Sequence, residues 1–130
     1  MPKLPVRAVL AKRLNELRKD LGVSQAELGI RMGIPPDVAS TRVNRYEKGV
    51  HAPDLETLEA MARELGVPLP YLVAQDERLA ELIRSFAGLP VADQDRVLKE
   101  VERVRRNPTP VKKVAKKAAS KKTKTPVRRK

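Results

Sequence analysis

The sequence predicts an all-α protein with a five-helix domain, two further helices and a disordered tail. The core must consist of leucine, valine, isoleucine, alanine and methionine, because Tyr46, Tyr71 and Phe86 are the only aromatic residues of the 130. That composition favours small helices over a β-sandwich, which usually uses aromatic and β-branched strands. Apolar residues also recur every three or four positions, and glycines, prolines and helix-capping residues separate these runs.

The first two predicted helices are separated by Gly22. The first covers about residues 6–21 and carries an apolar face at helical spacing, formed by Leu10, Leu14, Leu17 and Leu21. Ser24 begins the second helix as its N-cap, and Glu27 three residues later completes a capping box. Gly29 costs this helix about 1 kcal/mol relative to alanine. We therefore expect a neighbouring helix to approach Gly29 closely.

The third and fourth predicted helices each begin after a proline. The third lies within residues 37–47, and its side chains Val43 and Tyr46 face the core. Asp54 caps the fourth helix. The apolar stripe of the fourth helix consists of Leu55, Leu58, Met61, Ala62 and Leu65.

Further helices are predicted around residues 70–73, 76–87 and 91–105. The last two are apolar on one side only, with Leu79, Leu82, Ile83 and Phe86 in the first and Val97, Leu98, Val101 and Val104 in the second. These apolar sides either complete the core of the same subunit or form the interface of a homodimer. The predicted domains are residues 6–75, 76–106 and 107–130.

The charge of the chain is divided unevenly. Residues 1–104 contain 16 lysines and arginines and 16 acids, whereas residues 105–130 contain 12 lysines and arginines and no acid. The whole net charge of +12 therefore lies in the terminal segment. From Asn107 onward the sequence is of low complexity and cannot bury enough apolar surface to offset its conformational entropy. We expect this tail to be disordered.

Several kinds of site are disfavoured by the composition. The chain has no cysteine and His51 is its only histidine, so we expect neither disulfides nor a metal site. No Ser/His/Asp set, phosphate-binding glycine loop or paired carboxylate cluster is present, so we expect no enzyme activity, no cofactor and no small-molecule ligand. No run approaches the roughly 20 apolar residues that cross a bilayer, and no signal peptide is visible. We expect a cytoplasmic protein.

Several short motifs follow one another in a defined order between residues 10 and 73. They are LR at 17–18, GVSQAEL at 22–28, RYEKG at 45–49, PDLETL at 53–58 and LGV at 65–67. In order and spacing they resemble the Xre/Cro-type, lambda-repressor-like helix-turn-helix family. The resemblance implies a salt bridge between Arg18 and Glu47 that ties the first helix to the end of the third.

The resemblance also implies which residues bind DNA. In such domains the second helix crosses the DNA backbone, and the third lies in the major groove. Ser24 and Gln25 begin the second helix, where free N–H groups and the helix dipole favour a phosphate. The implied contacts of the third helix come from Ser40, Thr41, Arg42, Asn44, Arg45 and Lys48. The alternative is that these are ordinary polar residues on a solvated face.

The third helix departs from the family pattern in one respect. The usual spacing between the turn and the Tyr46-Glu47 pair is shorter by about four residues, and the extra residues fall within 35–39. Four residues are close to one helical turn. They either lengthen the third helix or form a separate turn before it. Either arrangement alters which side chain first reaches a base.

These features together predict a sequence-specific transcriptional regulator, a repressor that occupies its operator as a homodimer on double-stranded DNA. The tail resembles the lysine-rich arms of linker histones and of some nucleoid proteins, and we expect it to bind phosphates without reading sequence. We expect the protein in the bacterial cytoplasm, associated with the nucleoid. Two alternatives are an antitoxin whose later helices bind a toxin, and an architectural nucleoid protein with little sequence preference.

Overall fold

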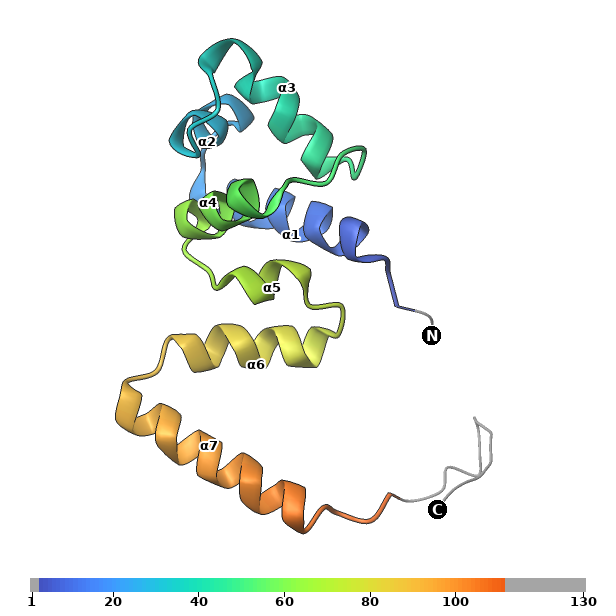
Figure 1. The fold of residues 1–130 in the computed structure, drawn as a ribbon, viewed down its shortest axis with the longest axis vertical. Coiled ribbons are helices and arrows are strands. Elements are labelled where there is room, and N and C mark those ends of the chain that lie inside the picture. The colour runs from blue at the N-terminus through green and yellow to red at the C-terminus, as the bar shows by residue number, and fades with distance from the viewer. Residues whose placement is uncertain (1–2, 112–130) are drawn as a thin grey trace. The chain divides into compact units, whose positions relative to one another are not determined.

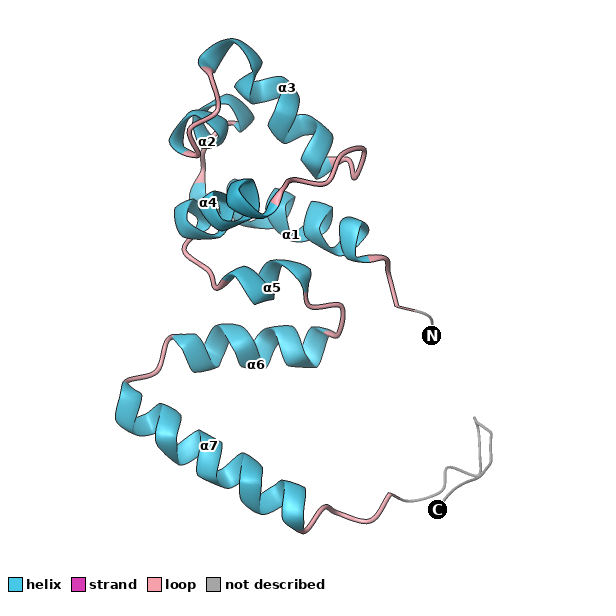
Figure 2. Ribbon diagram, in the orientation of Figure 1, coloured by secondary structure: helices cyan, strands magenta, loops and turns pink. Residues whose placement is uncertain are grey.

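The computed structural model describes residues 3–111, and within that range it contains seven helices and no strand (Figures 1 and 2). The helices are α1 (Val6–Leu21), α2 (Gln25–Arg31), α3 (Pro36–Glu47), α4 (Leu55–Leu65), α5 (Leu69–Val73), α6 (Glu77–Ala87) and α7 (Val91–Arg106). The predicted all-α class is confirmed. Most of the predicted tail, from residue 112 onward, lies outside the described residues.

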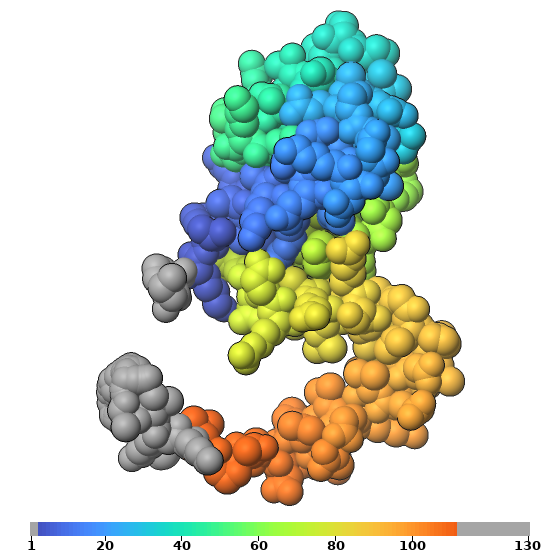
Figure 3. Space-filling model, turned by 180° about the vertical axis from the view of Figure 1, so that it is seen from behind, coloured from blue at the N-terminus to red at the C-terminus, as the bar shows by residue number. Residues whose placement is uncertain are grey.

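The chain divides into two units, one ending at Gln94 and one beginning at Asp95, so that α7 spans the boundary. Helices α1 to α6 belong to the first unit. Within the first unit, α2 and α3 lie at the end opposite α6 (Figure 1). The space-filling view, drawn from behind, likewise shows α2 and α3 together at one end (Figure 3).

The helix ends follow local capping chemistry. Ser24 Oγ accepts a hydrogen bond from the backbone N–H of Glu27 at 3.0 Å, so α2 begins where the sequence predicts. The Glu27 carboxylate instead accepts from Arg31 at 2.8 Å, and only the Ser24 half of the capping box is formed. Gly22 ends α1 with φ at 74°, a left-handed conformation that side chains other than glycine rarely adopt.

One hydrophobic core joins the first five helices. Each of α1 to α5 contributes at least one large side chain with no exposed surface, namely Leu14, Leu28, Val43, Met61 and Leu72. Complete burial of one such side chain contributes about 1.5–3 kcal/mol. The positions of α2 and α3 relative to each other are therefore fixed by packing as well as by the turn between them.

Two apolar residues do not lie where the periodicity predicts. Leu21 is 46% exposed and Leu55 is 73% exposed, so their prediction as core-facing residues is wrong. Leu21 is the last residue of α1 and Leu55 is the first of α4. Helical spacing continues to the ends of a helix, but the rest of the domain does not cover these two terminal residues. The remaining leucines of both stripes, including Leu10, Leu17 and Leu58, are buried as predicted.

Within the described residues, the apolar sides of α6 and α7 each contain exposed residues beside half-buried ones. Helix α6 contacts α5 and buries Ala80, whereas Leu79 and Leu82 are each about half exposed. In α7, Leu98 is 57% exposed and Val101 is 49% exposed. In α6, completion of the core of the same subunit therefore accounts for only part of the apolar side.

Candidate nucleic-acid interface

Gly29 of α2 and Ala39 of α3 form a close contact between two helices. A Cβ atom placed on Gly29 would lie 2.8 Å from the Cβ and 3.1 Å from the Cα of Ala39. That spacing is too short for two methyl groups, so only glycine allows this approach. The sequence prediction of a close neighbour at Gly29 is confirmed.

The structure also shows where the extra residues before Val43 lie. Helix α3 runs without interruption from Pro36 to Glu47, so the extra residues lengthen the helix rather than form a separate turn. Pro36 occupies the first helical position, where its missing N–H is not required. Ala39, in the added turn, is fully buried against α2. Helix α3 thus projects one turn further than the family spacing implies.

Helix α3 has a buried side and an exposed side. Ala39 and Val43 are fully buried, and Tyr46 is half-buried beside them. On the opposite side, positions separated by three, four or seven residues align along one stripe. We call this stripe the α3 outer face, and among the predicted DNA-binding residues it contains Thr41, Asn44, Arg45 and Lys48.

The structure separates the remaining predicted residues of α3 from the outer face. Ser40 and Arg42 are exposed, but helical geometry places them on the two flanks of the stripe. The Arg42 charge also acts on Asp54. Hydrogen bonds from Thr57 are the main cause that lowers the pKa of the Asp54 carboxyl, and the nearby Arg42 adds to it. Arg42 therefore lies toward the start of α4.

Ser24 and Gln25 lie together at the start of α2. Ser24 is exposed and caps the helix, as described above. Gln25 is half-buried, and its Nε2 donates a hydrogen bond to Glu47 Oε1 at 3.1 Å. The first residue of α2 is thus tied to the last residue of α3.

Glu47 accepts hydrogen bonds from three residues on two helices, α1 and α2. Its carboxylate accepts from Arg18 through both Nε and Nη2, from Asn15 Nδ2 at 2.9 Å and from Gln25 Nε2 at 3.1 Å. Arg18 also donates to the backbone carbonyl of Val23 at 2.9 Å. The predicted salt bridge between Arg18 and Glu47 is confirmed. Motif spacing indicated this pair, whereas no local pattern marked Asn15 as its partner.

The pKa of Glu47 reports this arrangement. Burial of the carboxylate by itself raises the pKa, but the hydrogen bonds from Arg18, Asn15 and Gln25 and the Arg18 charge outweigh burial. The pKa of Glu47 is therefore lowered from its ordinary value. The Glu47 hydrogen bond raises the pKa of Arg18. Both groups are thus charged at neutral pH.

A second buried charge lies on the other side of α1. Arg13 is 3% exposed and donates to the carbonyl oxygens of Tyr71 and Ala74, at 2.7 Å for Tyr71. Its guanidinium carbon also lies 5.0 Å from the centre of the Tyr71 ring. Arg13 thus holds the end of α5 and the entry to α6. The only sequence signal was a charged residue beside the apolar face of α1.

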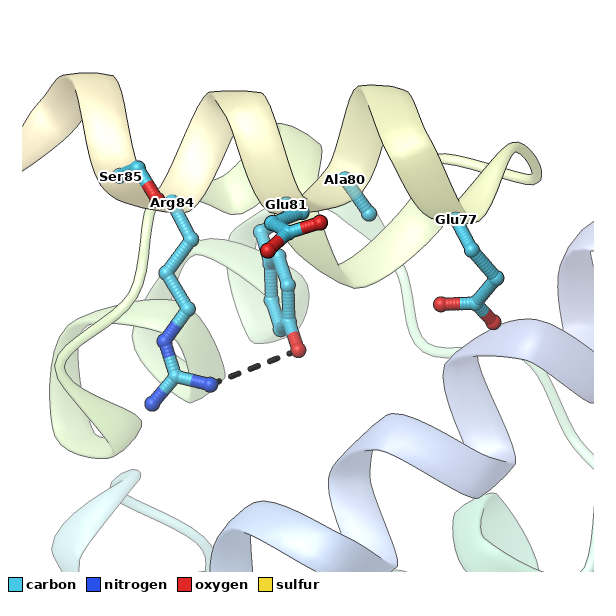
Figure 4. Close-up of a pocket in the computed structure, with 6 residues that line it drawn as sticks. Glu77, Ala80, Glu81, Arg84 and Ser85 are labelled. Carbon is cyan, nitrogen blue, oxygen red and sulfur yellow. Dashed lines mark hydrogen bonds between the residues drawn. The ribbon is translucent and has the colours of Figure 1, made fainter.

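Next to this contact is a shallow pocket of about 310 Å³ on α5 and α6 (Figure 4). Arg84 covers the Tyr71 ring at 5.3 Å and makes a long hydrogen bond of 3.5 Å to its hydroxyl. Glu77, Ala80, Glu81 and Ser85 complete the lining. Among the described residues, no three potential ligands gather into a metal site. None of the described helices has the length and apolar character to cross a membrane.

Comparisons with known proteins agree with this geometry. A helix-turn-helix family match covers residues 14–72. The chain is 29% identical over 92 residues to the cryptic phage CTXphi transcriptional repressor RstR of Vibrio cholerae, covering 67% of this chain and 79% of RstR.

The crystal structure of the transcriptional regulator BswR superposes with a TM-score of 0.66 at 34% identity. That superposition covers 72% of this chain and 92% of BswR. Residues 14–72, which match the helix-turn-helix family, contain the Gly29–Ala39 contact, the α3 outer face and the Arg18–Glu47 pair. The chain therefore belongs to the Xre/Cro-type helix-turn-helix family of DNA-binding proteins.

Proposed function

We propose that this protein is a sequence-specific transcriptional regulator that represses by occupying its operator. The observation that carries the proposal is the α3 outer face, a stripe of hydrogen-bonding side chains that are exposed, or half-buried in the case of Asn44, beside the start of α2. The names of two similar proteins, a transcriptional repressor and a transcriptional regulator, support it. DNA as the partner makes the bacterial nucleoid, in the cytoplasm, the expected place of action.

The proposed contacts follow from side-chain chemistry. With α3 in the major groove, Arg45 can donate two hydrogen bonds to guanine and Asn44 can pair with adenine. The Thr41 methyl group suits thymine. Ser24 and Gln25 at the start of α2 would contact the DNA backbone. Ser40 and Lys48 would add contacts to DNA phosphates.

Alanine substitution tests this assignment. Arg45→Ala and Asn44→Ala should each cost about 1–3 kcal/mol of binding and relax the preference at particular bases. Arg42→Ala belongs in the same series, because its flank position should make its effect on base preference smaller. Arg78→Ala is the matched control, because Arg78 is exposed on α6 at the opposite end of the unit. If all three α3 variants keep the wild-type consensus in a selection from random DNA, α3 does not read the sequence.

A homodimer is the proposed binding form, in which a second copy covers the exposed apolar side of α6. The second copy would bury the side chains of Leu79 and Leu82, which one subunit leaves about half exposed. Because α6 lies away from α3 (Figure 1), pairing there leaves the outer face open. The operator should then contain two half-sites about one helical turn apart.

Light scattering tests the dimer. The wild type should have twice the mass of the chain, and Leu82→Glu should reduce it to one chain. Leu21→Ser is the matched control, because Leu21 is similarly exposed but lies on α1. A wild type that is monomeric both free and on its operator would exclude the dimer. A complex with an unrelated protein in place of a second copy would favour an antitoxin.

The tail is proposed to add affinity that does not depend on sequence. Its 12 positive charges lie in residues 105–130, mostly outside the described part of the structure. Each neutralised phosphate changes the slope of log K against log[salt] by about 0.9. Truncation after Arg106 should therefore flatten the salt dependence and leave the preferred sequence unchanged. Equal slopes for the two proteins would exclude this role, and weak discrimination against random DNA would favour an architectural protein.

A further inference from the structure

The added turn of α3 carries one exposed acid, Asp37. Asp37 is the second residue of α3 and is exposed. Its carboxylate makes no hydrogen bond or ion pair with any described residue. The other acid of α3, Glu47, has a side chain only 5% exposed and is bonded internally. Asp37 is therefore the α3 carboxylate that an approaching DNA duplex would meet.

Helical geometry places Asp37 on the α3 outer face. It precedes Thr41 by four residues, Asn44 by seven and Arg45 by eight. Residues at these spacings lie on one side of a helix. Each residue adds about 1.5 Å, so Asp37 lies about 6 Å beyond Thr41 along the helix axis. The N-terminal residues of a recognition helix are those that contact base edges.

The added turn is held firmly rather than frayed. Ala39, two residues after Asp37, is fully buried against Gly29, and Pro36 fixes the backbone immediately before Asp37. The direction of the Asp37 side chain from the backbone is thus set by packing. A carboxylate held in this way can discriminate between bases, because its position does not adapt to each of them.

We propose that Asp37 is a specificity-determining residue, which accepts a hydrogen bond from a base amino group in the major groove. This inference rests on the proposed function of α3. Cytosine N4 is the favoured donor, and adenine N6 is the other source of the same chemistry. Guanine O6 and N7 and thymine O4 are acceptors, so a carboxylate facing them is repelled. The added turn therefore extends the sequence that the helix reads.

A selection from random duplex DNA with the full chain tests the proposal. The wild type should require cytosine, or adenine, at one outer position of each half-site. Asp37→Ala removes the acceptor, so it should reduce that preference about tenfold and leave the other positions unchanged. It should also raise affinity for random DNA, because a charge that repels phosphate is removed. Alanine is the best helix former, and circular dichroism will confirm that the variant folds.

Glu56→Ala is the matched control, since Glu56 is an exposed acid at the second position of α4, as Asp37 is in α3. It should leave the selected sequence unchanged. If Asp37→Ala lowers the melting temperature but keeps the wild-type consensus, Asp37 only stabilises the helix dipole and the proposal fails. If Arg45→Ala changes the consensus in that same case, the proposed function of α3 still stands. A wild type that selects no consensus would overturn both.

Discussion

Arg18 and Glu47 form an ion pair that is almost completely removed from solvent. Their side chains are 13% and 5% exposed, and they join α1 to the last residue of α3. Because Gln25 donates to the same carboxylate, the pair also fixes the first residue of α2. The Glu47 carboxylate thus positions α2 and α3, the two helices proposed to contact DNA.

Replacing Glu47 should be costly. Glu47→Gln leaves the Arg18 charge buried without its partner, which should lower the free energy of unfolding by about 3 kcal/mol. Urea denaturation measures this change. Glu27→Gln is the matched control, because Glu27 forms an exposed pair with Arg31 and glutamine also suits the third position of a capping box. The control should change stability by less than about 1 kcal/mol. Equal losses in the two variants would contradict a special role for Glu47.

The stability of the wild type should depend on pH through Glu47. Its pKa is lower in the folded chain than its ordinary value of 4.5, so the folded state favours the charged carboxylate. The resulting stabilisation is fully present above pH 4.5 and is lost as the pH falls through the lowered folded pKa. Melting temperatures measured between pH 7 and pH 2 should fall less steeply for Glu47→Gln in this acid range. Parallel acid limbs for the two proteins would show that other carboxyls control acid unfolding.

Gly29→Ala should destabilise the protein although alanine is the better helix former. The new methyl group would meet the Cβ of Ala39 at 2.8 Å, and overpacking of this kind costs about 1–3 kcal/mol. Gly88→Ala is the control, because a Cβ there meets its nearest atom at 3.7 Å and the backbone φ is −85°. Gly29→Ala combined with Ala39→Gly should recover part of the loss. A Gly29→Ala variant that melts at or above the wild-type temperature would contradict the tight contact.

Arg13→Met should loosen α5 and α6 while leaving the α3 outer face intact. Methionine fills a similar volume, but it leaves the carbonyl groups of Tyr71 and Ala74 without their donor, at about 1–3 kcal/mol each. Hydrogen exchange should accelerate in α5 and α6 more than in α2 and α3. Arg84→Met removes the exposed arginine from the same ring and should have little effect. Uniform acceleration over all helices would mean that Arg13 supports the whole domain.

Much of this fold can be predicted because its signals are local. The leucine spacing in α1, the Ser24 and Asp54 caps and the glycine at the end of α1 each depend on residues a few positions apart. The periodicity fails at Leu21 and Leu55, because burial depends on which residues the rest of the domain covers. No helix pattern contains that information.

The interface is less predictable than the fold. Motif order indicated the Arg18–Glu47 pair, but the contributions of Asn15 and Gln25 to the same carboxylate require the packed arrangement of three helices. The sequence also left open whether the extra residues before Val43 lengthen α3. The contact between Gly29 and Ala39 accounts for the answer, and it joins residues of two different helices.

The length of the added turn also bears on how such a helix can change over evolution. Four residues advance an α-helix by about 400°, a full circle plus only 40°. The chain leaving α2 therefore enters the longer helix from nearly its former direction, and Val43 keeps its place in the core. An addition of two residues would rotate the entry point by about 200° and exchange buried for solvent-facing positions. Helices of this kind can therefore lengthen in whole turns, each bringing a new side chain to DNA without redesign of the interior.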